Sequence, residues 1–133
     1  MKSPVPVTAL YGAMSALLNV ALAANVSRVR AARKIFLGDG GDELMTRAQR
    51  AHANNAEYVP LAIVLLLILE LSGGPSLMLH VLGGVLVTGR VIHAAGMLSA
   101  GLAKGRVLGI LLTWATIAAL AVLDIYYRCG CSG

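Results

Sequence analysis

Four long apolar stretches alternate along the chain with short polar segments rich in glycine. The apolar stretches cover residues 5–26, 58–69, 77–98 and 106–127, and the second reaches spanning length only when it is extended back through residue 50. An α-helix needs about 20 residues to cross the roughly 30 Å hydrocarbon core of a bilayer. Glycine clusters at residues 38–42, 72–75 and 101–105 mark turns between the stretches. The pattern therefore predicts an all-α, integral membrane four-helix bundle, with residues 1–133 forming a single domain.

The composition favours a membrane protein over other classes. Hydrophobic residues make up 58% of the 133 positions and charged residues 13%, with a mean hydropathy of +0.79. Soluble domains average about 45–50% apolar and about 25% charged residues. Too few polar side chains remain here to coat a water-soluble surface, and intrinsic disorder is excluded. The net charge of +5 does not indicate nucleic acid, because one tryptophan and one phenylalanine form no stacking surface.

The distribution of cations predicts how the helices are oriented. Six of the eleven lysines and arginines lie between Arg28 and Arg50, and Lys104 precedes the fourth stretch. Because basic loops stay on the cytoplasmic side, we expect both of these connections to be cytoplasmic and both termini to lie outside. The first connection is expected to run from Arg28 to Arg47 and to meet membrane lipid headgroups. In a bacterium, this membrane would be the inner or plasma membrane.

A stripe of polar residues enters the second apolar stretch. Arg47, Arg50, Asn54 and Glu57 are spaced three, four and three residues apart, which places them on one helical face. Ionisable groups at membrane depth cost about 2.5–3.5 kcal/mol each on insertion scales, so each requires an explanation. An Arg50–Glu57 ion pair or a snorkelling helix end is the simpler interpretation, which we favour for Arg47. For Asn54 and Glu57, we predict a functional polar cavity.

Polar residues of the third and fourth stretches are expected at the same depth. Arg90 and His93 lie one turn apart on the third, and Arg106 opens the fourth. Guanidinium groups bind carboxylates bidentately, and Glu57 can accept an ammonium group. If the ligand also carries a thiol, Arg106 can hold it as the more nucleophilic thiolate. The residues therefore predict a site for a small ligand that carries several anionic groups and one amine.

Polar residues elsewhere have simpler expected roles. Glu70, His80 and Asp124 lie near the outer boundary, where charge costs little. Cys129 and Cys131 have no histidine or second cysteine pair nearby, so we expect no metal site. A disulfide between the two cysteines and a passive tail both remain open.

Three sequence elements resemble the signature of the MAPEG family, the membrane-associated proteins in eicosanoid and glutathione metabolism. They are RAQRAHANNAEYVP at residues 47–60, GRVIH at residues 89–93, and Arg106. The resemblance implies a homotrimer of four-helix subunits that binds glutathione, as co-substrate, between neighbours. It also implies roles for individual residues: glutathione binding by Arg50, Asn54, Glu57 and Tyr58, a site wall from Arg90 and His93, a contact from Arg28 of the adjacent subunit, and thiolate stabilisation by Arg106.

The chain departs from eicosanoid-type members at Met97, where they carry a tyrosine, and at Val107 and Ile110, where some carry a serine and a tyrosine. The resemblance therefore implies a glutathione transferase or peroxidase acting on lipophilic small molecules, rather than prostaglandin or leukotriene chemistry. A glutathione-binding protein without catalysis is the alternative. A small four-helix multidrug transporter is disfavoured, because such transporters need an acidic residue in the first span and residues 5–26 contain none.

Overall fold

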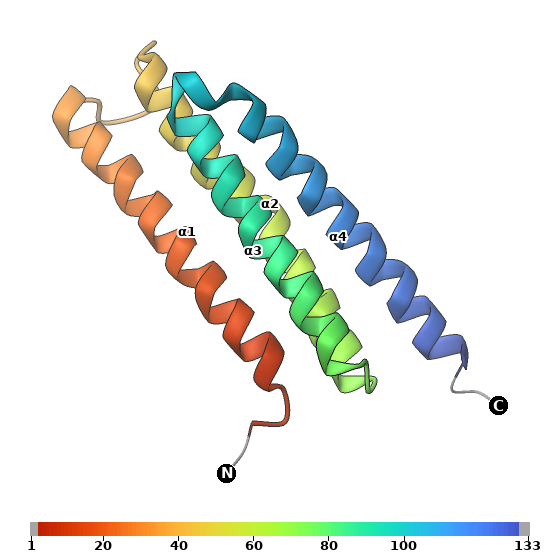
Figure 1. Ribbon diagram of the computed structural model, residues 1–133. Helices are drawn as coiled ribbons and strands as arrows, with labels where there is room; N and C mark the ends of the chain where they lie inside the picture. The colour runs from red at the N-terminus through yellow and green to blue at the C-terminus, as the bar shows by residue number, and fades with distance from the viewer. Residues whose placement is uncertain (1–2, 131–133) are drawn as a thin grey trace.

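The computed structural model describes residues 3–130, which form a bundle of long α-helices (Figure 1). The helices are α1 (Pro6–Arg33), α2 (Glu43–Leu71), α3 (Ser76–Leu98) and α4 (Ala103–Gly130), with a short 3-10 turn, η1 (Ala100–Leu102), before α4. All four α-helices are long and apolar enough to cross a membrane. The predicted all-α membrane architecture is therefore confirmed over the described residues. Lys2 and Cys131 lie outside them.

The helices extend beyond the apolar stretches at the basic end of the molecule. Helix α1 continues through the arginines as far as Arg33, and α2 already begins at Glu43. The expected loop from Arg28 to Arg47 is therefore wrong at both ends, since only residues 34–42 lie between the helices. Arginine is a good helix former, and the Asp42 side chain caps α2 by accepting a hydrogen bond from the Met45 amide at 2.8 Å.

Helices α2 and α3 occupy the middle of the bundle. Helix α1 packs against both of them, and α4 also packs against both, whereas α1 and α4 do not contact each other within residues 3–130. Figure 1 shows α1 and α4 on opposite sides of the central pair, and α1 begins at the end of the bundle where α4 finishes. At the opposite end of the bundle, α2 begins, α3 ends and α4 begins, so these three helix ends lie close together.

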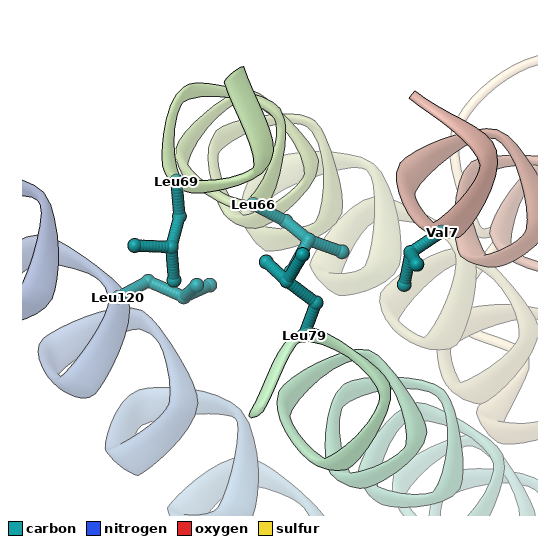
Figure 2. Packing of buried hydrophobic residues seen from close by; sticks show 5 residues of the cluster. All are labelled: Val7, Leu66, Leu69, Leu79 and Leu120. Atoms are coloured by element: carbon teal, nitrogen blue, oxygen red, sulfur yellow. The ribbon is translucent and has the colours of Figure 1, made fainter. Parts of the chain in front are cut away.

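An apolar core holds together the end of the bundle where α1 begins. Leu66 and Leu69 of α2 meet Leu79 of α3 and Leu120 of α4, with Val7 of α1 on the other flank (Figure 2). All five side chains are buried. Each helix contributes, so this cluster fixes the relative positions of all four.

Two polar contacts reinforce the same end. Glu70, near the end of α2, accepts hydrogen bonds from the backbone amides of Val7 and Thr8 at 2.9 and 2.7 Å. These amides belong to the first turn of α1, which has no side-chain cap of its own. His80 Nδ1 lies 3.2 Å from the Tyr11 hydroxyl, and the hydrogen bond between these two groups joins α3 to α1.

Glycines allow α3 and α4 to approach each other at the basic end. A Cβ atom built on Gly109 would lie 2.5 Å from the Gly89 carbonyl oxygen and 2.5 Å from the His93 amide nitrogen. Gly96 likewise faces the backbone of Arg106. Only glycine fits such backbone contacts, and the two helices that carry His93 and Arg106 are therefore closely packed beside these residues.

Candidate functional site

A polar pocket of about 410 Å³ opens at the basic end of the bundle, where α2 begins, α3 ends and α4 begins. It is lined by Thr46, Arg47, Arg50, Asn54, His93, Met97 and Arg106. Four residues that the sequence analysis singled out, Arg50, Asn54, His93 and Arg106, are thus brought together from three helices. The volume falls within the range of about 300–1,000 Å³ that is typical of small-molecule sites.

Arg90 lies next to this pocket but is buried, with only 1% of its surface exposed. Its Nη2 donates to the Asn54 Oδ1 at 2.7 Å and to the His93 Nδ1 at 3.1 Å. Its Nε donates to the Asn55 Oδ1 at 3.3 Å, and its Nη1 to the Thr113 Oγ1 at 3.4 Å. The guanidinium group therefore orients two residues of the pocket wall from behind.

No carboxylate forms a salt bridge with Arg90 among residues 3–130, where the recorded pairs are Arg33–Asp42 and Arg47–Glu43. Its partners are amide oxygens, a hydroxyl and an imidazole, which accept from four of its five N–H donors without neutralising its charge. A buried charge acts over longer distances than an exposed one, because water screens it less. Arg90 therefore adds to the positive potential that Arg50 and Arg106 create at the pocket.

The contact with Arg90 also sets the proton position on His93. A guanidinium group donates hydrogen bonds and cannot accept them, so the His93 Nδ1 must be the acceptor. A neutral His93 consequently carries its proton on Nε2. The ring presents one donor, Nε2–H, for any partner other than Arg90.

The polar network continues from Arg90 to helix α1. The Asn55 Nδ2 donates to the Asn19 Oδ1 at 3.1 Å, and Thr113 also donates to the Gly109 carbonyl oxygen at 2.8 Å. Through these bonds one guanidinium group connects all four helices. Sequence reasoning missed Asn19, Asn55 and Thr113, although amides within spans are unusual enough to have marked Asn19 and Asn55.

Arg106 is the fourth residue of α4 and lines the pocket from that helix's first turn. This turn contains no acidic residue. The positive end of the helix dipole and the guanidinium group therefore favour an anion at the same place.

A smaller hollow of about 230 Å³ adjoins the polar pocket. The two share Thr46, Arg47, Met97 and Arg106. The smaller one extends to Glu43 at the start of α2 and to Gly96, Ser99 and Ala103 near η1. Arg106 therefore borders two connected spaces. Met97, the position at which the chain departs from eicosanoid-type members, also borders both.

Three other residues named by the sequence analysis do not line the polar pocket. Glu57 is exposed on α2, and Arg28 is exposed on α1, where it donates to the Asn25 Oδ1 at 2.9 Å. Tyr58 lies beside Trp114 of α4, with ring centroids 6.5 Å apart. In the single chain, these residues therefore stand apart from Arg50, Asn54, His93 and Arg106.

The loop before α2 is tied to the rim of the pocket through Asp39. Its carboxylate accepts hydrogen bonds from the Gly41 amide at 3.0 Å and from the hydroxyl of the pocket residue Thr46 at 3.2 Å. The hydrogen bond from the Gly41 amide contributes most to lowering the pKa of the Asp39 carboxyl below its usual value, and the hydrogen bond from Thr46 contributes next. The ionised form thus stabilises the ordered loop.

Known proteins resemble this chain over nearly its whole length. The MAPEG family model matches residues 8–126. The chain is 36% identical over 121 residues to the "Inner membrane protein YecN" of Escherichia coli strain K12, and the match covers 91% of this chain and 92% of that protein. The protein of the same name from Escherichia coli O6:H1 matches with the same identity and coverage. With four helices able to span a membrane and a family match over most of its length, this chain is a multi-pass integral membrane protein that belongs to the MAPEG family.

Proposed function

We propose that the polar pocket binds glutathione and that the protein uses the bound thiol in a transferase or peroxidase reaction. The observation that carries this proposal is the convergence of Arg50, Asn54, His93 and Arg106 on one pocket of suitable volume. Membership of a family named for glutathione metabolism supports it.

The chemistry of the pocket matches the chemistry of glutathione. The tripeptide carries two carboxylates, one ammonium group and one thiol. Arg50 and Arg106 offer guanidinium groups, which bind carboxylates in a planar, bidentate manner, whereas Arg47 is already paired with Glu43. The Asn54 side chain and the His93 Nε2–H add neutral hydrogen-bonding groups for the peptide backbone.

Arg106 is proposed to stabilise the thiolate. A thiol has a pKa of about 8.5, and a neighbouring guanidinium group or a helix N-terminus lowers that value. Arg106 combines both features in the first turn of α4. A larger thiolate fraction at neutral pH raises the rate of attack on an electrophile.

The adjoining hollow near η1, whose lining includes the charged residues Glu43 and Arg47, is proposed to receive the polar reactive end of the lipophilic second substrate. In conjugation, the thiolate sulfur forms a bond to an electrophilic carbon, and the leaving group departs with the electron pair of the bond that breaks. In the peroxidase reaction, two glutathione molecules are oxidised to the disulfide while a hydroperoxide is reduced to an alcohol and water. Arg106 borders both spaces, so the reacting atoms would meet beside it.

Glu57 and Arg28 are proposed to act in an assembly of subunits. Glu57 is exposed in the single chain, yet it lies about 14 residues, or roughly 21 Å, from the end of α2 at Leu71, well within the length of a span. A carboxylate facing lipid at that depth is unfavourable, so a neighbouring subunit is expected to cover it. In the proposed homotrimer, Arg28 of the neighbour and Glu57 complete the glutathione site, with Glu57 binding the ammonium group.

Met97 favours a second candidate, a protein that binds glutathione without turning it over. Met97 lies in the wall of the pocket, at the position where eicosanoid-type members carry a tyrosine. Its thioether cannot donate a hydrogen bond to a reacting oxygen. Binding by the wild-type protein without measurable turnover would identify this second candidate.

The Arg106→Ala variant tests the catalytic proposal. We expect turnover with 1-chloro-2,4-dinitrobenzene to fall at least about 100-fold, as for the loss of a group that stabilises developing negative charge. The ultraviolet absorbance of bound thiolate should fall in parallel. Assembly, measured by light scattering in detergent, should not change, because Arg106 is exposed rather than part of the core.

Arg128→Ala is the matched control, since it removes an exposed arginine from the last turn of the same helix. It should retain both turnover and the thiolate signal. Wild-type turnover in Arg106→Ala would refute the role of Arg106. Absence of glutathione binding by the wild-type protein, measured by calorimetry, would refute the proposed ligand.

A further inference from the structure

The loop after α1 presents two large apolar side chains to the surroundings beside several cations. Phe36 is 96% exposed and Leu37 is 91% exposed. Arg30, Arg33 and Lys34 directly precede them. This combination of exposed apolar and basic side chains is typical of segments that lie in a membrane interface.

A hollow of about 400 Å³ lies between the last turns of α1 and this loop. It is lined by Ser27, Arg30, Ala31, Lys34, Ile35 and Phe36. The first four are spaced so that they share one face of the helix, and Ile35 and Phe36 close the hollow from the loop. None of the six lines the polar pocket, so this is a separate place on the molecule.

The loop is held in a defined conformation. The Arg30 Nη1 donates to the carbonyl oxygens of Ile35 and Gly38 at 3.3 and 3.2 Å, and the Gln49 Nε2 also donates to Gly38 at 2.9 Å. Ile35 packs on the buried cluster that contains Val29. Phe36 and Leu37 are therefore directed outward by an ordered loop.

Lys34 occupies a backbone position that usually belongs to glycine. It has φ 55° and ψ 37°, in the left-handed region, and ends α1 with bonds from the amides of Lys34 and Ile35 to the carbonyls of Ala31 and Arg30. Glycine is the favoured residue at this position of a helix end, because other residues are strained there. The lysine also places a cation at the C-terminal end of α1, where the helix dipole favours positive charge.

The cation of Lys34 is not used in a salt bridge within residues 3–130, whereas Arg33 pairs with Asp42 at 3.4 Å. Arg30 uses only its Nη1 in the hydrogen bonds recorded for the described residues. The hollow therefore offers an ammonium group and the remaining guanidinium donors to an anion from outside the chain.

The length of α1 places this hollow at the membrane surface. The helix has 28 residues, or about 42 Å, whereas the hydrocarbon core is about 30 Å thick. The last turns of α1 carry Arg30 and Arg33, which are unfavourable in hydrocarbon, so this end of the helix extends into the headgroup layer, where cations meet lipid phosphates. Apolar side chains at this depth reach the upper part of the acyl chains.

We propose that this hollow binds an anionic phospholipid of the adjacent leaflet. The phosphate lies beside Lys34 and Arg30, and Phe36 and Leu37 contact the acyl chains below it. Net negative lipids are preferred over zwitterionic ones, because a zwitterionic headgroup carries its own ammonium group near its phosphate. This site is independent of glutathione binding and of turnover.

The full-length protein in nanodiscs made of phosphatidylglycerol and phosphatidylethanolamine tests the proposal. Native mass spectrometry then gives the ratio of the two lipids that remain bound. Lys34→Asn removes the charge, and asparagine accepts the left-handed conformation. We expect Lys34→Asn to lower the enrichment of phosphatidylglycerol about fivefold. This is the effect expected from the loss of one cation at the level of the lipid headgroups.

Two variants serve as matched controls. Lys104→Asn removes an exposed lysine from the first turn of α4, at the same end of the bundle, and Lys34→Arg keeps the charge. Both should retain wild-type enrichment. Phe36→Ser should lower the retention of both lipids, since Phe36 contacts acyl chains.

Three results would overturn the proposal. The first is wild-type enrichment in Lys34→Asn, and the second is an equal loss in Lys34→Asn and Lys104→Asn, which would indicate diffuse attraction between charges. The third is a change in oligomeric mass in Lys34→Asn, which would show that another copy of the chain covers the hollow.

Discussion

At the scale of single residues, Arg90 connects the fold to the candidate site. Its guanidinium group is buried and bonds to side chains of α2, α3 and α4, including two residues of the pocket wall. Sequence reasoning predicted Arg90 at the level of Asn54, to which it bonds, and assigned it to the wall of the site. Its burial could not be read from the spacing, because spacing gives a helical face and not the depth of packing on that face.

Arg90→Met should strongly destabilise the protein. The substitution leaves the amide oxygens of Asn54 and Asn55 and the His93 Nδ1 without their donor, and each buried acceptor left unsatisfied costs about 1–3 kcal/mol. Unfolding in detergent by a denaturant titration measures this loss. Nitrogen-15 NMR of His93 should also show the Nε2–H form in the wild-type protein and a changed Nδ1 signal in the variant.

Thr113→Val provides the comparison for Arg90→Met. It removes one long hydrogen bond to Arg90, of 3.4 Å, and should cost about 1 kcal/mol. If both variants lose the same stability, Arg90 does not organise the network.

At the scale of elements, the start of α1 is stabilised by a contact with a residue far away in the sequence. Helix α1 begins with its first amides bonded to Glu70, at the far end of α2. Sequence analysis placed Glu70 at a membrane boundary but found no partner for it. The partner is a backbone group, which no sequence pattern identifies.

Glu70→Gln should destabilise the start of α1. The amide side chain keeps one acceptor oxygen but loses the negative charge that favours a helix N-terminus, a loss of about 1 kcal/mol. Thermal unfolding in detergent, followed by circular dichroism, measures the change. Glu43→Gln alters an exposed i,i+4 pair with Arg47 and an exposed first-turn charge of α2, but no capping hydrogen bond to a backbone amide. It should cost about 0.5 kcal/mol or less; equal effects of the two variants would argue against the capping role.

The basic segment between the first two apolar stretches shows why helix ends are difficult to predict from hydropathy. Hydropathy falls at Arg28, yet α1 continues to Arg33 and α2 starts at Glu43. Hydropathy reports where lipid ends, whereas helix ends depend on caps such as Asp42 and on the turn at Lys34. The polar pocket is built in this part of the bundle, from residues that lie beyond or at the edge of the apolar stretches.

At the scale of the whole molecule, the single chain does not bring all of the predicted site residues together. The pocket combines Arg50, Asn54, His93 and Arg106, whereas Glu57 and Arg28 are exposed elsewhere. Exposed charge on a helix that crosses the membrane is best explained by assembly, in which a second subunit covers it. The roles of Glu57 and Arg28 therefore remain predictions for the proposed homotrimer.

Glu57→Gln should weaken glutathione binding if Glu57 binds the ammonium group. Loss of a charge-assisted hydrogen bond corresponds to a rise in Kd of about 10-fold to 100-fold. Calorimetry in detergent measures the affinity, and Glu70→Gln, the same change at the far end of α2, should leave it unaltered. An unchanged Kd in Glu57→Gln would contradict the assignment even if Arg106→Ala abolishes turnover.

The order of residue types along the chain was enough to predict the class of fold, the number of helices able to span a membrane and the grouping of polar residues at one end of the bundle. These follow from helical periodicity and from the free-energy cost of charge in lipid, both of which depend on the order of residue types along the chain. The packing of the helices determines which polar groups face the pocket, which lie buried behind it and which remain uncovered. That division depends on how closely α3 and α4 approach through Gly109 and on hydrogen bonds, such as those of Arg90, between residues far apart in the chain.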